Sequence, residues 1–270
     1  MAGLEARGSG LVLSDENVFE LAKTFWESGP TGLQQGTALF SYLKGFTDAS
    51  IRVTKDNMSM VAAEMTSIQL QIGIIHPYLT PDDYDTAKST IEDHARGQLS
   101  ERTREHVEWR IRSNESGRRG IAHYIDSAPV LQRALGSVSE EELPGWIRWV
   151  RSTTDGVNYL AWQIKHYFDD KPFEDIYEYA QLLQRSTANR VAMGLTARNF
   201  YFNWRYVHHD SIKKDLFFDS QHIVNANYCD VYATKEPKQA RYAHLLLTPA
   251  TRVCVYDPTQ MPINQWLLSL

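Results

Sequence analysis

Apolar and polar residues alternate in two different ways along the chain. Short apolar runs at 11–14 (LVLS), 231–234 (VYAT) and 252–257 (RVCVYD) predict strands near the two ends. Over most of the remaining length, apolar residues recur every three or four positions, which is typical of helices that bury one face. The pattern therefore predicts strand and helix pieces at both ends of the chain.

The N-terminal piece, residues 1–76, is predicted to alternate between strands and helices. The LVLS strand is followed by a helix, because apolar residues of the next segment lie at helical spacing. The elements expected after LVLS are a helix at 15–28, a helix at about 33–45, a strand at 49–54 and a helix at 56–75.

Residues 77–200 have a different character, because strand-like alternation almost disappears and amphipathic helical segments follow one another. The end pieces are each too small to fold alone. We therefore predict one α/β core with a parallel sheet, formed by residues 1–76 and 201–270. A large all-helical insertion at 77–200 would interrupt that core.

The composition says more about the cellular location of the protein than about its function. The 270 residues are 43% hydrophobic and 23% charged, with a net charge of −5, which is ordinary for a folded protein and gives no bulk attraction for nucleic acid. Cys229 and Cys254 are too few for a disulfide framework or a thiolate zinc site. Without a signal peptide or an apolar run that could span a membrane, the expected location is the cytoplasm, with no membrane partner.

Three acids, with Asp230 as a weaker neighbour, fall where a parallel sheet would present them. Ligands bind at the carboxyl edge of such sheets. Glu20 lies one turn into the helix after LVLS, Asp219 is expected at the start of a helix, and Glu236 follows VYAT by two residues. Asp230 precedes the same strand. Converging carboxylates repel unless a hard cation joins them, so this placement predicts a Mg²⁺ or Mn²⁺ site.

Each acid also has an ordinary structural explanation. Asp219 would serve as a helix N-cap, and Glu20 would belong to a solvated helix face. Glu236, before a proline, and Asp230 would be polar turn residues. Only their joint placement favours the metal site.

Two segments resemble a known family. LVLSDENVFELAKTF, at 11–25, resembles the strand–helix unit of PIN-domain-like ribonucleases, in which a Glu in an ELA context belongs to the acidic site. DSQHIVNANYCDVYATKEPKQARYAHLL, at 219–246, resembles a later segment of that family. There an Asp opens a helix, a strand follows, and an acid after a Thr completes the site.

The resemblance implies a metal-dependent endoribonuclease that hydrolyses phosphodiester bonds in RNA, with single-stranded RNA as the expected substrate. Its catalytic and metal-holding acids would be Glu20, Asp219 and Glu236, with Asp230 as a weaker neighbour. Thr234 would lie at the edge of the site. The residues expected to contact the substrate are Arg205, Thr234 and Lys235.

The chain departs from the family at its beginning. Family members open with a strand that ends in an Asp, and residues 1–10, MAGLEARGSG, contain no such strand. Either the native chain starts upstream of Met1, or the strand and its Asp have been lost. The second case predicts a catalytically inactive PIN-like interaction protein, and the family analogy allows an antitoxin or another protein as its partner.

A third function is open from the sequence. His208, His209 and Asp210 are consecutive, as in HD-type phosphohydrolases. That chemistry needs further His and Asp ligands at helical positions, and the other histidines are scattered without a matching pattern. The alternative is that these histidines are surface or capping residues.

Overall fold

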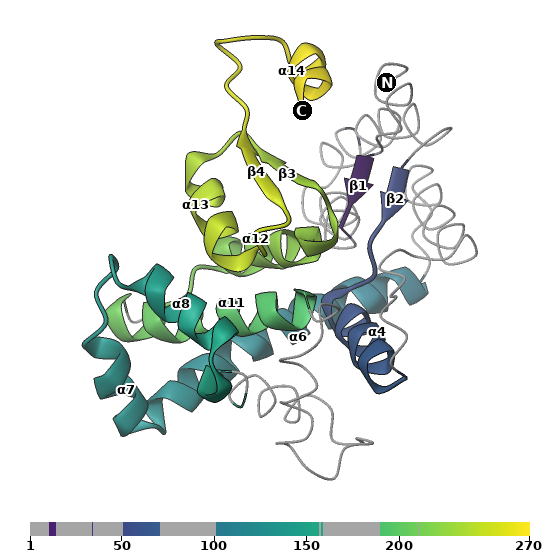
Figure 1. The fold of residues 1–270 in the computed structure, drawn as a ribbon. Coiled ribbons are helices and arrows are strands. Elements are labelled where there is room, and N and C mark those ends of the chain that lie inside the picture. The colour runs from purple at the N-terminus through teal and green to yellow at the C-terminus, as the bar shows by residue number, and fades with distance from the viewer. Residues whose placement is uncertain are drawn as a thin grey trace. The chain divides into compact units, whose positions relative to one another are not determined.

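The computed structural model describes residues 11–14, 34, 51–70, 101–156, 158, 190–209 and 211–270. The chain divides into two compact units. The smaller unit comprises residues 1–56, 76–115 and 256–270, and the larger unit comprises residues 57–75 and 116–255. Figure 1 shows the elements of both units.

The smaller unit contains a parallel strand pair and a C-terminal helix. Strands β1 (Leu11–Leu13) and β2 (Ile51–Val53) pair in parallel, with Leu11 opposite Ile51. Helix α14 (Ile263–Ser269) carries Trp266, whose ring lies 5.1 Å from that of Tyr256 between centroids. Both strands were predicted from the sequence, and the structure confirms them.

The larger unit is mainly helical. Its elements are α4 (Asn57–Gln69), the second half of α6 (Glu101–Asp126), α7 (Pro129–Gly136), α8 (Leu143–Ser152), α11 (Arg190–His209), α12 (Lys214–Asn225), η1 (Ala226–Tyr228), β3 (Val231–Thr234), α13 (Pro237–Leu246) and β4 (Arg252–Val255). Strands β3 and β4 pair in parallel, with Thr234 opposite Val255. Helix α13 connects them, so this part of the chain is a β–α–β unit.

The described residues therefore form a mixed α/β protein that is helical in bulk and holds two small parallel strand pairs. This confirms the general class predicted from the sequence. Helix α11 runs through residue 200, where the core and the insertion were expected to meet. The division into core and insertion stays a prediction. In the described part of the chain, no helix is long and apolar enough to cross a membrane.

The start of α12 was predicted wrongly. The sequence placed a helix start at Asp219, but α12 begins at Lys214, so Asp219 lies in its second turn and is not an N-cap. The reason is packing: Leu216 and Phe217 are buried together with Ile223, and this apolar face extends the helix backwards by more than a turn.

Helix α11 is the centre of the larger unit. Its side chains are buried on nearly all sides, including Val191, Phe202 and Trp204. Helices α4, α7, α8, α12 and α13 all pack against it. Buried positions occur around the whole circumference of α11, although some of them are polar, such as Asn199 and Asn203. The surrounding elements therefore take their positions from this helix.

Gly194 allows the closest approach to α11. A Cβ atom at this position would lie 2.8 Å from Nδ2 of Asn227 and 3.2 Å from the carbonyl oxygen of Leu246. Asn227 is fully buried, donates to the carbonyl of Val224 at 2.8 Å, and accepts the N–H of Thr248 at 2.8 Å. The absence of a side chain at Gly194 therefore lets α11 contact the loop and helix that flank β3.

Candidate functional site

The carboxyl end of β3 is a tightly hydrogen-bonded turn. The hydroxyl of Thr234, which is nearly buried, donates to Oε1 of Gln239 at 2.8 Å and accepts the backbone N–H of Glu236 at 3.1 Å. Gln239 lies in the first turn of α13. Thr234 therefore fixes the direction in which the chain presents Glu236, whose own side chain is exposed.

Asp219 and Glu236 act on the same side chain. Burial raises the pKa of the Tyr232 phenol above its ordinary range, and the negative charges of Asp219 and Glu236 raise it further. Tyr232 is in the middle of β3. Two of the three predicted site acids are thus close enough to influence one phenol.

Asp230 lies elsewhere. It directly precedes β3, and its carbonyl accepts the backbone N–H of Arg252 at 2.9 Å, at the amino end of the strand pair. The length of β3 therefore separates Asp230 from Thr234 and Glu236. Burial raises the pKa of the neighbouring Cys229 thiol to about 11, and the charge of Asp230 adds to that effect.

Glu20, the third predicted acid, lies outside the described residues. Among the residues that are described, no group of three or more His, Cys, Asp and Glu side chains is arranged to hold a metal ion. Of the three main predicted acids, the structure therefore describes Asp219 and Glu236.

The predicted substrate contacts occupy different surroundings. Lys235 is exposed in the turn after β3. Thr234 uses its hydroxyl within that turn, as described above. Arg205 is part of α11 and hydrogen-bonds the hydroxyl of Tyr201, whose pKa is raised mainly by burial. Lys235 is therefore the predicted contact whose side chain is most open to a ligand.

His208 and His209 have packing roles. Nε2 of His208 lies 3.1 Å from the carbonyl oxygen of Leu135, at the end of α7, and both imidazole rings contact Trp204. Nε1 of Trp204 donates to the carbonyl of Val138 at 2.7 Å. These contacts join α11 to the end of α7 and favour the structural explanation over an HD-type metal site. Asp210 lies outside the described residues.

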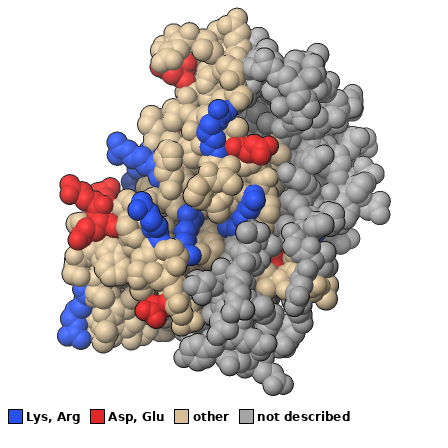
Figure 2. All heavy atoms as spheres, viewed as in Figure 1, with Lys and Arg blue, Asp and Glu red and all other residues tan. Residues whose placement is uncertain are grey.

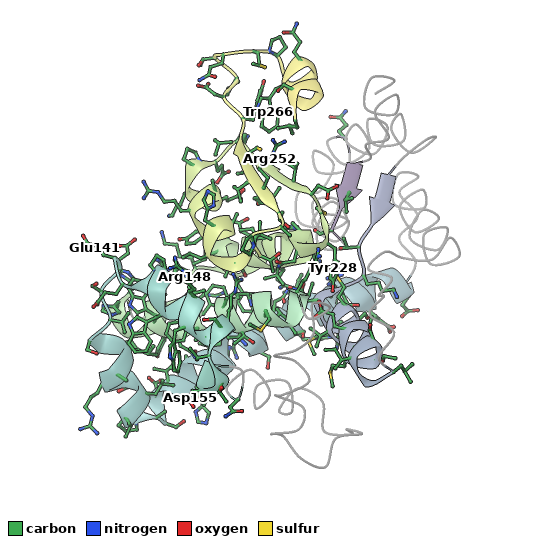
Figure 3. All side chains as sticks on the ribbon, in the orientation of Figure 1. Glu141, Arg148, Asp155, Tyr228, Arg252 and Trp266 are labelled. Carbon is green, nitrogen blue, oxygen red and sulfur yellow. The ribbon has the colours of Figure 1, made fainter. Side chains whose placement is uncertain are left out.

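The buried carboxylate of Glu64 was not among the residues predicted from the sequence. This side chain is fully buried in α4, and its two oxygens accept the backbone N–H groups of Val191 at 2.6 Å and Ala192 at 2.8 Å. The hydroxyl of Tyr228 donates to it at 2.6 Å. Figure 3 shows Tyr228 where α4 and the start of α11 meet.

The effect of this arrangement is to cap α11 from another helix. The first N–H groups of a helix have no partner within it, and Glu64 supplies one. Burial raises the pKa of Glu64 to about 7, although the hydrogen bonds from Tyr228, Val191 and Ala192 and the charge of Arg190 lower it. The signal in the sequence was an acid on the apolar face of a helix, one turn from Met60 and Ile68.

Comparison of the chain with protein-family models, with curated proteins and with solved structures finds no match.

Proposed function

We propose that this protein is a PIN-like, metal-dependent endoribonuclease whose acidic site lies at the carboxyl end of β3. The observation that carries the proposal is the position of Glu236, just past the carboxyl end of β3 in a parallel strand pair, and the charges of Asp219 and Glu236 on Tyr232 support it. These two acids are 17 positions apart in the sequence, and both raise the pKa of one phenol. The parallel β3–α13–β4 unit supports the proposal, because acids at the carboxyl edge of a parallel sheet are placed for ligand binding.

The donors fit a hard divalent cation. Asp219 and Glu236 offer carboxylate oxygens, which Mg²⁺ and Mn²⁺ prefer. When bound, such a cation supplies positive charge for the attacking water and for the leaving oxygen of a phosphodiester. Thr234 holds the backbone of Glu236 in place, and Tyr232, with its raised pKa, stays a neutral phenol beside the two carboxylates.

The test is cleavage of labelled single-stranded RNA in the presence of Mg²⁺ or Mn²⁺. The site variant is Asp219→Asn/Glu236→Gln. The matched control is Asp215→Asn/Glu141→Gln, which removes two exposed acids of the same types from α12 and from the turn before α8. We expect metal-dependent cutting by the wild type and the control, and its loss in the site variant.

Two results would overturn this function. Equal cutting by the site variant and the wild type would place the activity elsewhere. Failure of the wild type to cut with either metal would instead favour the inactive PIN-like interaction protein, which keeps the fold without the chemistry.

A further inference from the structure

The outer face of α13 is basic in a chain that is acidic overall. The sequence holds 33 Asp and Glu residues against 28 Lys and Arg. Over residues 237–256, however, Lys238, Arg241 and Arg252 occur with no Asp or Glu. All three are exposed. This segment begins directly after Glu236, so a basic surface starts where the proposed acidic site ends.

Helical geometry places these side chains in a row. Lys238, Arg241 and His244 are exposed and three residues apart, whereas Ala240, Ala243 and Leu246 form the buried face of the same helix. A three-residue step advances about 4.5 Å along a helix and turns about 60° around it. The three side chains therefore form one stripe along α13, which we call the α13 stripe.

The stripe is followed by further positive charge on α8. The guanidinium of Arg151 donates to the carbonyls of Leu247, at 2.9 Å, and Leu246, which brings α8 against the end of α13. Arg148 is exposed one turn earlier on α8. Figure 2 shows Lys and Arg side chains over the face where α13 and α8 lie, and Figure 3 labels Arg148.

The position of Lys238 is unfavourable for the helix itself. It lies in the first turn of α13, where the helix dipole is positive and an acid is preferred. A cation at this position costs stability, typically about 0.3–1 kcal/mol. An anion bound along the stripe would offset this cost.

We propose that the α13 stripe binds the phosphate backbone of single-stranded RNA and leads the strand to the acidic site. The inference rests on the proposed function, because it names the path of that enzyme's substrate. The complementary charges carry it: Lys238 and Arg241, side by side on one helix face, match the phosphates of a strand, and such contacts position a strand without reading its sequence.

The test measures binding without cleavage. A 5′-fluorescein-labelled RNA of about 12 nucleotides, without secondary structure, is titrated with the full chain in EDTA, and fluorescence anisotropy is recorded from 50 to 200 mM KCl. The stripe variant is Lys238→Ala/Arg241→Ala, which a helix tolerates because alanine is the best helix former. The control is Arg133→Ala/Lys213→Ala, which removes two exposed cations outside α13.

Each phosphate contact contributes about −0.7 to the slope of log K against log salt for a single strand. We expect the stripe variant to reduce the magnitude of the slope by about 1.4 and to weaken binding roughly 25-fold at 0.1 M salt. The control should leave both nearly unchanged. Equal losses in the two variants, or no loss in the stripe variant, would overturn the proposal.

Two further outcomes separate this inference from the proposed function. In one outcome, RNA binding in EDTA depends on the stripe, but the protein does not cut RNA when metal is added. This result supports RNA binding by the stripe and overturns only the proposed ribonuclease activity. If labelled poly-glutamate binds in a stripe-dependent manner and RNA does not, the stripe is a docking surface for an acidic protein, and the proposal falls.

Discussion

Oε1 of Glu64 and the hydroxyl of Tyr228 lie 2.6 Å apart, although 164 residues separate them in the chain. The tyrosine pKa is raised well above its ordinary range, by burial first and then by the charge of Glu64. Tyr228 therefore remains a hydrogen-bond donor at every pH at which the protein is studied. Glu64 is the partner that titrates in this pair. Its titration should therefore be measurable as a dependence of stability on pH.

The first prediction concerns pH and stability. The Glu64 pKa rises from 4.5 in the unfolded chain to about 7 in the fold. The folded state therefore binds more protons between these values, and the free energy of unfolding should fall as pH rises from about 4.5 to 7. The shift corresponds to roughly 3 kcal/mol. Urea unfolding at several pH values measures it.

The control for this prediction is Tyr228→Phe. The hydrogen bond from Tyr228 lowers the Glu64 pKa, so its removal should move the titration to higher pH without abolishing it. In Glu64→Gln the titration should disappear. If Glu64→Gln retained the same fall in stability between pH 4.5 and 7, the buried carboxylate would not be its source.

The second prediction concerns Gly194. Gly194→Ala would bring a methyl group within 2.8 Å of Asn227 and 3.2 Å of the Leu246 carbonyl. Overpacking of this kind costs roughly 1–3 kcal/mol of unfolding free energy. Gly120→Ala in α6 is the matched control, because nothing lies within 4 Å of the added Cβ. Helix propensity predicts that the control is more stable, by up to about 1 kcal/mol. Thermal unfolding of both variants shows whether each is more or less stable than the wild type. Equal changes in stability would contradict the close contact at Gly194.

The third prediction concerns the end of α13. Arg151 is largely buried, which lowers its pKa to about 10, so it stays charged at pH 7 while it binds the carbonyls of Leu246 and Leu247. Arg151→Met leaves both carbonyls without this donor and should cost about 2–4 kcal/mol of unfolding free energy. Arg148→Met, on the exposed side of α8, should change it by less than about 0.5 kcal/mol. A similar loss in both variants would show that only the surface charge matters.

The fourth prediction tests how the turn after β3 supports the proposed site. Thr234→Val removes the acceptor for the N–H of Glu236 and the donor to Gln239. We expect a loss of about 1 kcal/mol of stability and a fall in kcat of metal-dependent RNA cutting, with binding in EDTA unchanged. Thr234→Ser keeps the hydroxyl and should restore both. Undiminished kcat in Thr234→Val would mean that this hydroxyl does not position Glu236.

The strands were predictable because their information is local. VYAT and RVCV are β-branched, apolar runs bounded by turn residues, and the structure places β3 and β4 on them. The start of α12 was not predicted, since it depends on where Leu216 and Phe217 are buried. Acids before a strand and after it look alike in the sequence. The parallel pairing of β3 with β4 shows which end of the sheet each acid occupies: Asp230 lies at the amino edge and Glu236 at the carboxyl edge.

Polar groups that join distant segments could not be placed from the sequence. Glu64 bonds Val191 across 127 positions, and Arg151 bonds Leu247 across 96. No sequence motif marks either pair, because many different side chains can hydrogen-bond the unpaired backbone groups at the end of a helix. An acid on an apolar helix face predicts a buried partner without identifying it. For the proposed site, Asp219 and Glu236 were named by the resemblance, and their common neighbour Tyr232 was not.

The cap on α11 also has a consequence for the order of events in folding. During synthesis, Glu64 leaves the ribosome long before Val191 and Ala192. Its carboxylate is therefore at first ionised and hydrated. When α11 arrives, that water must leave before the carboxylate can accept the two N–H groups. Removing water from a charge is costly, and a proton on Glu64 reduces that cost. Assembly of the larger unit should therefore proceed faster in mildly acidic surroundings than in alkaline ones.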